Sequence, residues 1–334
     1  MSYCWLHHTR VYAAIAVITI HVAAQGQFTN EIGSLNWGVS ALYNSASKWC
    51  VPIYVIISGY LLYKNNDPNS LNSFYLKRAS KILIPLIFWS ILFTFWNIYY
   101  QKMNVNLALK KILIGKCYYH MWYLYMIIGL YIFSPFLNSM ASALSQTRFK
   151  FLLIIIFLLL SLNTIANTLH FKSSSPFFVW FIYYIPFYMY GSYLKIYGIK
   201  KINILRDKLL IFLLILLNFS AYQLLSIYGK DNLASYFFSY TSIFVIAYSL
   251  LIFQLFEKIF KATKHNMILE NLGQCTLGIY IIHPIFLDLL INYYPNIFTN
   301  FTFVMVPVFV IILFSFSYFV VSTIKKIKYL NIII

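Results

Sequence analysis

Residues 151–160 read FLLIIIFLLL, a run without a single charged or polar side chain. A second run of this kind, LLIFLLILL, occupies residues 209–217. Each run lies inside a longer apolar stretch of roughly 20 residues, the length that an α-helix needs to cross about 30 Å of hydrocarbon. We therefore predict that both stretches are membrane-spanning helices.

The whole chain shares this apolar character. Of its 334 residues, 61% are hydrophobic and only 10% are charged, whereas a soluble domain is about half apolar and about a quarter charged. A soluble protein of this size could not hide so much apolar surface, because it needs a partly polar exterior. Composition therefore predicts an integral membrane protein whose partners include the membrane lipids.

Apolar windows predict an all-α bundle of about ten spanning helices, separated by short polar or turn-rich stretches. The loops leave no room for a soluble domain, so we predict one membrane-embedded domain over residues 1–334. The predicted spans are residues 11–25, 44–63, 80–100, 121–139, 150–168, 177–196, 208–227, 236–257, 272–292 and 300–323.

The net charge of +18 comes from 25 basic and 7 acidic residues. Such basicity is one sign of nucleic-acid binding, but basic residues also mark cytoplasmic loops. With a cytoplasmic N-terminus, 18 basic residues fall inside and 7 outside. This bias predicts two cytoplasmic termini, an even number of spans and no nucleic-acid partner. The seven outer residues are Lys48, Lys102, Lys110, Lys111, Lys116, Lys172 and Lys230.

One predicted outer loop goes against this bias, because residues 101–120 carry four of the seven outer lysines. The loop could lie along the lipid headgroups as a basic amphipathic segment, or it could approach an anionic acceptor. Both interpretations stay open at the level of sequence.

The first span has some features of a signal peptide, including Arg10, an apolar run and the small residues Val22-Ala23-Ala24. A histidine within the apolar run is atypical of a cleaved segment, so we interpret it as a permanent span. The four cysteines form no CxxC pair, which predicts neither a zinc site nor a disulfide framework.

Arg10 and His21 are the leading candidates for function, because ionisable residues inside a span are costly. Eleven residues at about 100° each leave only ~20° of rotation, so both side chains face the same side of the helix. They would stand roughly 16 Å apart along its axis. A cation at the cytoplasmic surface with a deeper imidazole suits a negatively charged donor. The alternative is a packed histidine beside an arginine that only sets topology.

Three further motifs contain polar or flexible positions within spans. Ser58-Gly59 follows Pro52 in the second span, where a kink could line a cavity or only allow close packing. The aromatic run at residues 118–123, which includes His120 and Trp122, could be a membrane-interface belt or a platform for sugar rings. In the ninth span, Tyr280 and His283 share a helix face.

Acidic residues are scarce inside the predicted spans, where only Asp288 is found. Ion-coupled carriers usually need buried carboxylates, so this scarcity argues against a transporter. A glycan or lipid transporter without chemistry, and a structural partner in surface-polysaccharide assembly, remain the alternatives to an enzyme.

Four blocks together resemble a known family over nearly the whole chain. Arg10 and His21 have the spacing of its first-helix motif, and residues 44–61 resemble its second-helix block. Residues 119–135 resemble its fourth-helix block, and residues 277–284 its late-helix signature. The family is acyltransferase family 3, the membrane O-acyltransferases that modify bacterial surface glycans. Within it, the chain most resembles the enterobacterial common antigen O-acetyltransferase type.

The resemblance implies an O-acyltransferase of the bacterial cell (inner) membrane with no bound cofactor. Its donor substrate would be acetyl-CoA on the cytoplasmic side, and its acceptor a polysaccharide or lipid-linked glycan on the outer side. Many members carry two arginines three residues apart after the second helix. Here the positions are Arg78 and Lys81, and lysine keeps the charge but loses the bidentate geometry.

The candidate site follows from these implications. Arg10, Arg78 and Lys81 would bind the coenzyme A phosphates, and Arg10 is grouped with His21 at the catalytic centre. His21 would act as a general base or as a transient acyl carrier. The predicted acceptor-binding or orienting residues are Ser58, His120, Trp122, Tyr280 and His283.

Overall fold

The computed structural model describes residues 4–63, 71–170, 175–199, 203–263, 266–299 and 301–334. Within these ranges every regular element is a helix, which confirms the predicted all-α class. Nine helical segments of the described chain are long and apolar enough to cross a membrane. Lys64, Lys172, Lys200, Lys201 and Lys264, which entered the charge count, lie outside the described residues.

The nine spans are built from single helices or from two helices joined end to end. They are α1 (Cys4–Thr29), α2 (Leu35–Ser47) with α3 (Cys50–Leu62), α4 (Leu71–Arg78) with α5 (Ile84–Tyr99), α7 (Trp122–Ala143), α8 (Gln146–His170), α10 (Ile204–Ile227), α12 (Ile243–Phe260), α13 (Met267–Tyr293) and α14 (Thr302–Lys326). The shorter elements are η2 (Ala79–Leu83), α6 (Val105–Leu113), η3 (Phe177–Tyr184), α9 (Ile185–Tyr197), α11 (Asp231–Phe237) and η4 (Asn331–Ile333).

The predicted span at residues 177–196 consists of the 3₁₀ helix η3 followed by α9. Phe177 lies against Gly115, just before α7 begins. At the other end, the Tyr197 hydroxyl donates to the Leu144 carbonyl oxygen (2.7 Å), just beyond the end of α7. Together η3 and α9 therefore run the full length of α7. This segment is additional to the nine described helical segments that are long and apolar enough to cross a membrane.

Six spans begin earlier than hydropathy predicts, including the first two. α1 begins by Cys4 rather than residue 11, so Arg10 lies well inside the helix. The second span begins at Leu35, because the Ser34 side chain caps α2 by accepting the Trp37 N–H (3.3 Å).

The break between α2 and α3 falls at Lys48 and Trp49. Lys48, counted among the basic residues of the predicted outer side, is only 8% exposed. Its Nζ lies 5.0 Å from the centroid of the Phe238 ring and 5.2 Å from that of Tyr240. These aromatic faces stabilise a cation that has left bulk water.

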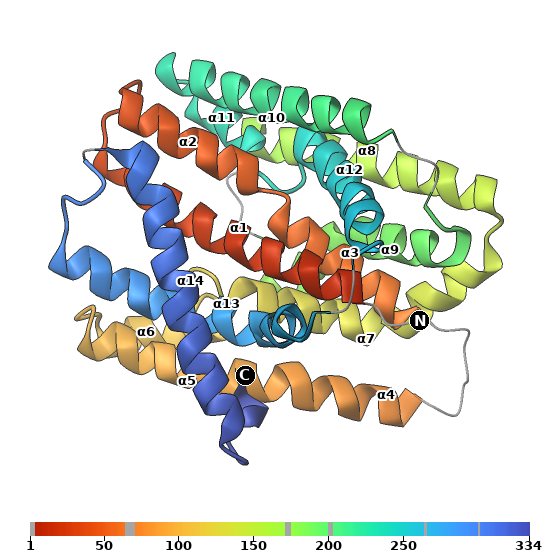
Figure 1. Ribbon diagram of the computed structural model, residues 1–334, viewed down its shortest axis with the longest axis horizontal. Coiled ribbons are helices and arrows are strands. Elements are labelled where there is room, and N and C mark those ends of the chain that lie inside the picture. The colour runs from red at the N-terminus through yellow and green to blue at the C-terminus, as the bar shows by residue number, and fades with distance from the viewer. Residues whose placement is uncertain (1–3, 64–70, 171–174, 200–202, 264–265, 300) are drawn as a thin grey trace.

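α1 crosses the middle of the bundle and contacts α2, α3, α12, α13 and α14 (Figure 1). Beside it, α3 and α9 approach backbone to backbone. A Cβ on Gly59 would lie 2.0 Å from the Tyr188 carbonyl oxygen, and one on Gly191 would lie 2.2 Å from that of Ile56. Small residues permit this close approach of membrane helices, so Gly59 has a packing role.

Candidate functional site

One cavity of the described chain has a volume of about 590 Å³ and is lined by residues of α1, α3, α4, η2, α7, α13 and η4. We call it the inner cavity, because its side of the bundle is the one predicted to be cytoplasmic. Arg10, Arg78 and Lys81 line it, and no Asp or Glu is among the described residues that do so. An excess of positive charge in a concave site favours an anionic ligand.

The local structure around Arg78 and Lys81 has an identifiable cause. Lys81 lies in the π-helical turn η2, four residues before Pro85. Proline cannot donate a backbone hydrogen bond and its ring clashes with the carbonyl four residues earlier, so the helix widens there. The Arg78 guanidinium lies over the rings of Phe74 (5.6 Å) and Tyr131 (5.9 Å), which hold it at the cavity wall.

Two residues predicted to orient the acceptor, Ser58 and Tyr280, also line the inner cavity. The Ser58 hydroxyl donates to the Tyr54 carbonyl oxygen of its own helix (3.0 Å). The Tyr280 hydroxyl donates to the backbone carbonyl oxygen of His120. The structure therefore separates Ser58 and Tyr280 from Trp122, which lines the other cavity.

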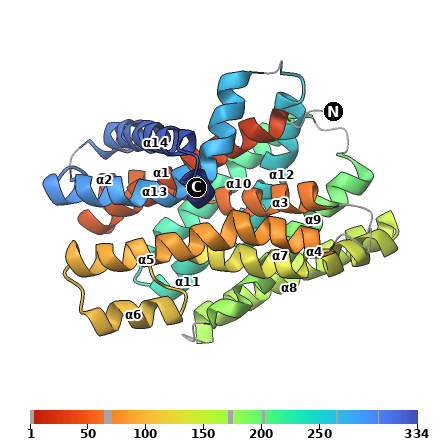
Figure 2. The ribbon, with the colours of Figure 1, turned by 90° about the horizontal axis from the view of Figure 1, so that it is seen from below.

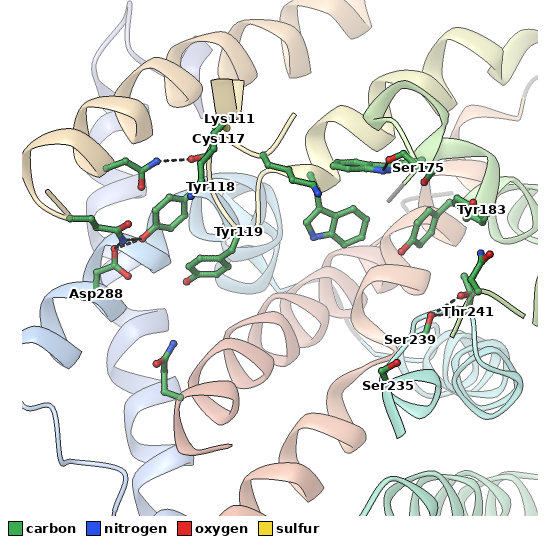
Figure 3. Close-up of a pocket in the computed structure, with 18 of the residues that line it drawn as sticks. Lys111, Cys117, Tyr118, Tyr119, Ser175, Tyr183, Ser235, Ser239, Thr241 and Asp288 are labelled. Carbon is green, nitrogen blue, oxygen red and sulfur yellow. Dashed lines mark hydrogen bonds between the residues drawn. The ribbon is translucent and has the colours of Figure 1, made fainter. Parts of the chain in front are cut away.

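The second cavity, which we call the outer cavity, has a volume of about 1300 Å³ (Figure 3). It lies toward the other end of the bundle, since Gln25 near the end of α1 lines it, whereas Arg10 near the start of α1 lines the inner cavity. Its wall is mostly amides, hydroxyls and aromatic rings. These include Gln25, Asn97, Gln101, Asn167, Asn232, Asn292, Thr164, Thr168, Thr241, Ser175, Ser235, Ser239, Tyr100, Tyr118, Tyr119, Trp122, Trp180, Tyr183 and Tyr184.

Three histidines from distant parts of the sequence meet between the two cavities. The His21 ring lies 5.2 Å from that of His283, which lies 5.8 Å from that of His120. The His21 ring is also 4.9 Å from that of Tyr119, which lines the outer cavity. His21 therefore adjoins the outer cavity, while Arg10 on the same helix lines the inner one. Among the described residues, no three His, Cys, Asp or Glu side chains are arranged so that they could hold a metal ion.

Hydrogen bonds assign the tautomers of two of these rings. His283 Nδ1 lies 3.1 Å from the Ile279 carbonyl oxygen, and His120 Nε2 lies 3.2 Å from that of Ile281. A carbonyl oxygen only accepts, so each of these nitrogens carries the proton. The other nitrogens, His283 Nε2 and His120 Nδ1, then keep a lone pair, and both are buried without a partner in the described chain.

The charge state of His120 agrees with this assignment. Burial lowers the pKa of His120 well below its ordinary value, and the neighbouring His283 and His21 lower it further. The ring is therefore neutral near pH 7, and its unpaired nitrogen can accept a hydrogen bond.

Asp288 forms a hydrogen-bonded cluster that fixes the segment leading to His120. Its carboxylate accepts hydrogen bonds from the Tyr118 hydroxyl, from Trp96 Nε1 (2.8 Å) and from Gln101 Nε2 (3.3 Å). Burial and then the nearby Asp288 carboxylate raise the pKa of Tyr118 above its ordinary value, so the phenol stays protonated and donates. Because the Asp288 carboxylate already accepts three hydrogen bonds, we interpret it as a residue that holds Tyr118, Trp96 and Gln101 in position.

The sequence indicated some of this site and missed other parts. Arg10 with His21, and His283 with Tyr280, were found because polar residues in apolar spans stand out. Tyr119, which contacts His21, was part of an aromatic run that could equally have been an interface belt. Tyr54, which lies beside Arg10 in the inner cavity, carries no sequence signal in a chain with 30 tyrosines. Tyr123 in the same cavity belonged to the aromatic run, but the sequence did not place it beside Arg10.

Comparison with known proteins gives one positive result. A family model described as an acyltransferase domain, that of acyltransferase family 3, matches residues 4–324. The matched range contains all nine candidate residues, from Arg10 to His283. Neither the curated proteins nor the solved structures gave a match.

Proposed function

This chain belongs to acyltransferase family 3 and is a multi-pass membrane acyltransferase, and we propose that it is an O-acetyltransferase. It moves an acetyl group from acetyl-CoA on the cytoplasmic side of a bacterial inner membrane. The acceptor is a hydroxyl of a surface polysaccharide or lipid-linked glycan, as in the enterobacterial common antigen type that the sequence resembles.

The position of His21 carries this proposal. Its helix has Arg10 at the wall of a cationic cavity, while its own ring contacts Tyr119 at the wall of a polar, aromatic cavity. A phosphate-bearing donor suits the first cavity by charge. A glycan suits the second, because amides and hydroxyls bind its hydroxyl groups and aromatic faces pack against sugar rings.

In the proposed reaction, Arg10, Arg78 and Lys81 hold the coenzyme A phosphates, and the thioester reaches toward His21. As a general base, His21 takes the proton of the acceptor hydroxyl while that oxygen attacks the thioester carbonyl. The C–S bond breaks, and the coenzyme leaves as a thiol after taking up the proton. As an acyl carrier, the neutral His21 nitrogen attacks the thioester first, the C–S bond breaks, and the coenzyme leaves as a thiol with the imidazole proton. The acceptor hydroxyl then attacks the acetyl-imidazole, and its proton returns to the imidazole as the N–C bond breaks.

His283 and His120 give this scheme two further hydrogen-bond acceptors. Their unpaired nitrogens lie in the same cluster as His21. Each can accept a hydrogen bond from the acceptor hydroxyl or from protonated His21. Trp122, whose ring lies 5.7 Å from that of Tyr184, supplies an aromatic wall for the sugar.

The most direct cellular test is mass spectrometry of surface glycans from a deletion strain, its parent and the complemented deletion strain. The proposal predicts that the mass increment of one acetyl group disappears on deletion and returns on complementation. An unchanged pattern of glycan acetylation in the deletion strain contradicts it.

A further inference from the structure

The helix α6 follows the predicted outer end of α5 and runs back alongside it, with apolar side chains and lysines exposed (Figure 2). Its start is capped by Asn104, whose side-chain oxygen accepts the backbone N–H groups of Asn106 and Leu107. The apolar residues Val105, Leu107, Leu109 and Leu113 are 50% to 76% exposed. α6 packs beside α5 at one edge of the bundle (Figure 2). Exposed apolar side chains interspersed with lysines are typical of a helix at headgroup depth.

The fold divides the four lysines of this loop into two kinds. Lys111, in the last turn of α6, and Lys116, just after the loop turns at Gly115 (φ 71°), both line the outer cavity. Lys102 and Lys110 are exposed and do not line it. Figure 3 shows Lys111 on the same side of the cavity as Cys117 and Tyr118.

The charge of Lys111 and Lys116 is not balanced by the described part of the protein. Among the described residues at the wall of the outer cavity, Asp288 is the only carboxylate, and its hydrogen bonds come from Tyr118, Trp96 and Gln101. Neither lysine forms an ion pair with another described residue. Topology does not account for them either, because basic residues on the predicted outer side oppose the usual charge bias.

We propose that Lys111 and Lys116 bind the phosphate that joins a glycan to its lipid carrier, so that the acceptor is lipid-linked. This inference rests on the proposed function, which places the acceptor in the outer cavity. A lipid-linked glycan carries its phosphate at headgroup depth, and Lys111 and Lys116 lie in the segment that joins the predicted outer ends of α5 and α7. Its sugars would extend along the polar wall toward Tyr119 and His21. Lysine is a compact cation that binds phosphate as a point charge.

The test compares the binding of three probes to the purified full-length protein in detergent micelles. Farnesyl phosphate carries both lipid and phosphate, farnesol carries the lipid alone, and inorganic phosphate carries the charge alone. The wild-type protein is expected to bind farnesyl phosphate at least tenfold more tightly than farnesol, because two charge-assisted contacts are made. Inorganic phosphate is expected to compete only weakly.

Two double variants show whether Lys111 and Lys116 cause the preference for farnesyl phosphate over farnesol. In the double variant K111Q/K116Q, the preference for farnesyl phosphate over farnesol is expected to fall to within about threefold. The matched control K102Q/K110Q loses the same charge from the same loop and is expected to keep the full preference. Retained binding of acetyl-CoA to the inner cavity verifies that the double variant is folded.

Each contrary outcome has a distinct meaning. An equal loss of preference in both double variants overturns the site, because general surface charge would then explain binding. Inorganic phosphate competing as well as farnesyl phosphate overturns the lipid-linked acceptor. The proposed function fails separately, if the wild-type protein gives no acetylated glycan in the deletion and complementation test.

Discussion

His21→Ala is expected to lower the turnover number for acetyl transfer by about 10²- to 10⁴-fold. The imidazole is the proposed base or acyl carrier, and alanine can perform neither task. The measurement is the rate at which coenzyme A is released in the presence of acceptor, in membranes that contain equal amounts of each variant.

The matched control for this prediction is His8→Gln, on the same helix. His8 is buried like a core residue and stacks on Phe260 with 5.1 Å between ring centroids, and it lines neither cavity. Its replacement is expected to leave turnover within about threefold of the wild type. Near-normal turnover in a stably expressed His21→Ala protein would remove His21 from the mechanism.

Arg10→Gln is expected to raise the KM for acetyl-CoA by roughly 10- to 100-fold, the effect of losing charge-assisted contacts to phosphate. Arg10→Lys should recover part of that loss, because lysine keeps the charge without the bidentate geometry. The measurement is kcat and KM at varied acetyl-CoA concentration and saturating acceptor.

Arg148→Gln is the matched control, since Arg148 is an exposed residue of α8 that lines neither cavity. Its KM for acetyl-CoA should equal that of the wild type. An Arg10→Gln protein with unchanged KM and reduced kcat would mean that Arg10 positions the reacting groups rather than binding the donor.

The spanning helices could be predicted from the sequence because membrane insertion depends on local hydropathy. The spacing of Arg10 and His21, at about 3.6 residues per turn, likewise places both side chains on one face of α1. Both predictions concern residues close together in the chain. The segment at 177–196 was predicted as one spanning helix, but the 3₁₀ conformation of its first half was not predicted. Its contacts with Gly115 and Leu144 show the path that it takes along α7.

The division of residues between the two cavities could not be predicted, because it depends on how distant helices pack. Ser58 and Tyr280 lie with Arg10 in the inner cavity, whereas Trp122 lies in the outer one. Neither hydropathy nor spacing distinguishes these positions. The same holds for Lys110 and Lys111, which are neighbours in the sequence although only Lys111 lines a cavity. Asp288 stood out as an acid in a span, but its three hydrogen-bond donors come from α5 and from the two loops on either side of α6.

The central claim is that the acetyl group crosses from one cavity to the other, past His21. Sealed proteoliposomes with one orientation of the protein test it, with labelled acetyl-CoA supplied only on the Arg10 side and the glycan acceptor only on the opposite side. Label should then appear in the glycan, and His21→Ala should stop its appearance. Label that reaches the glycan only when both substrates are on the same side would contradict the account.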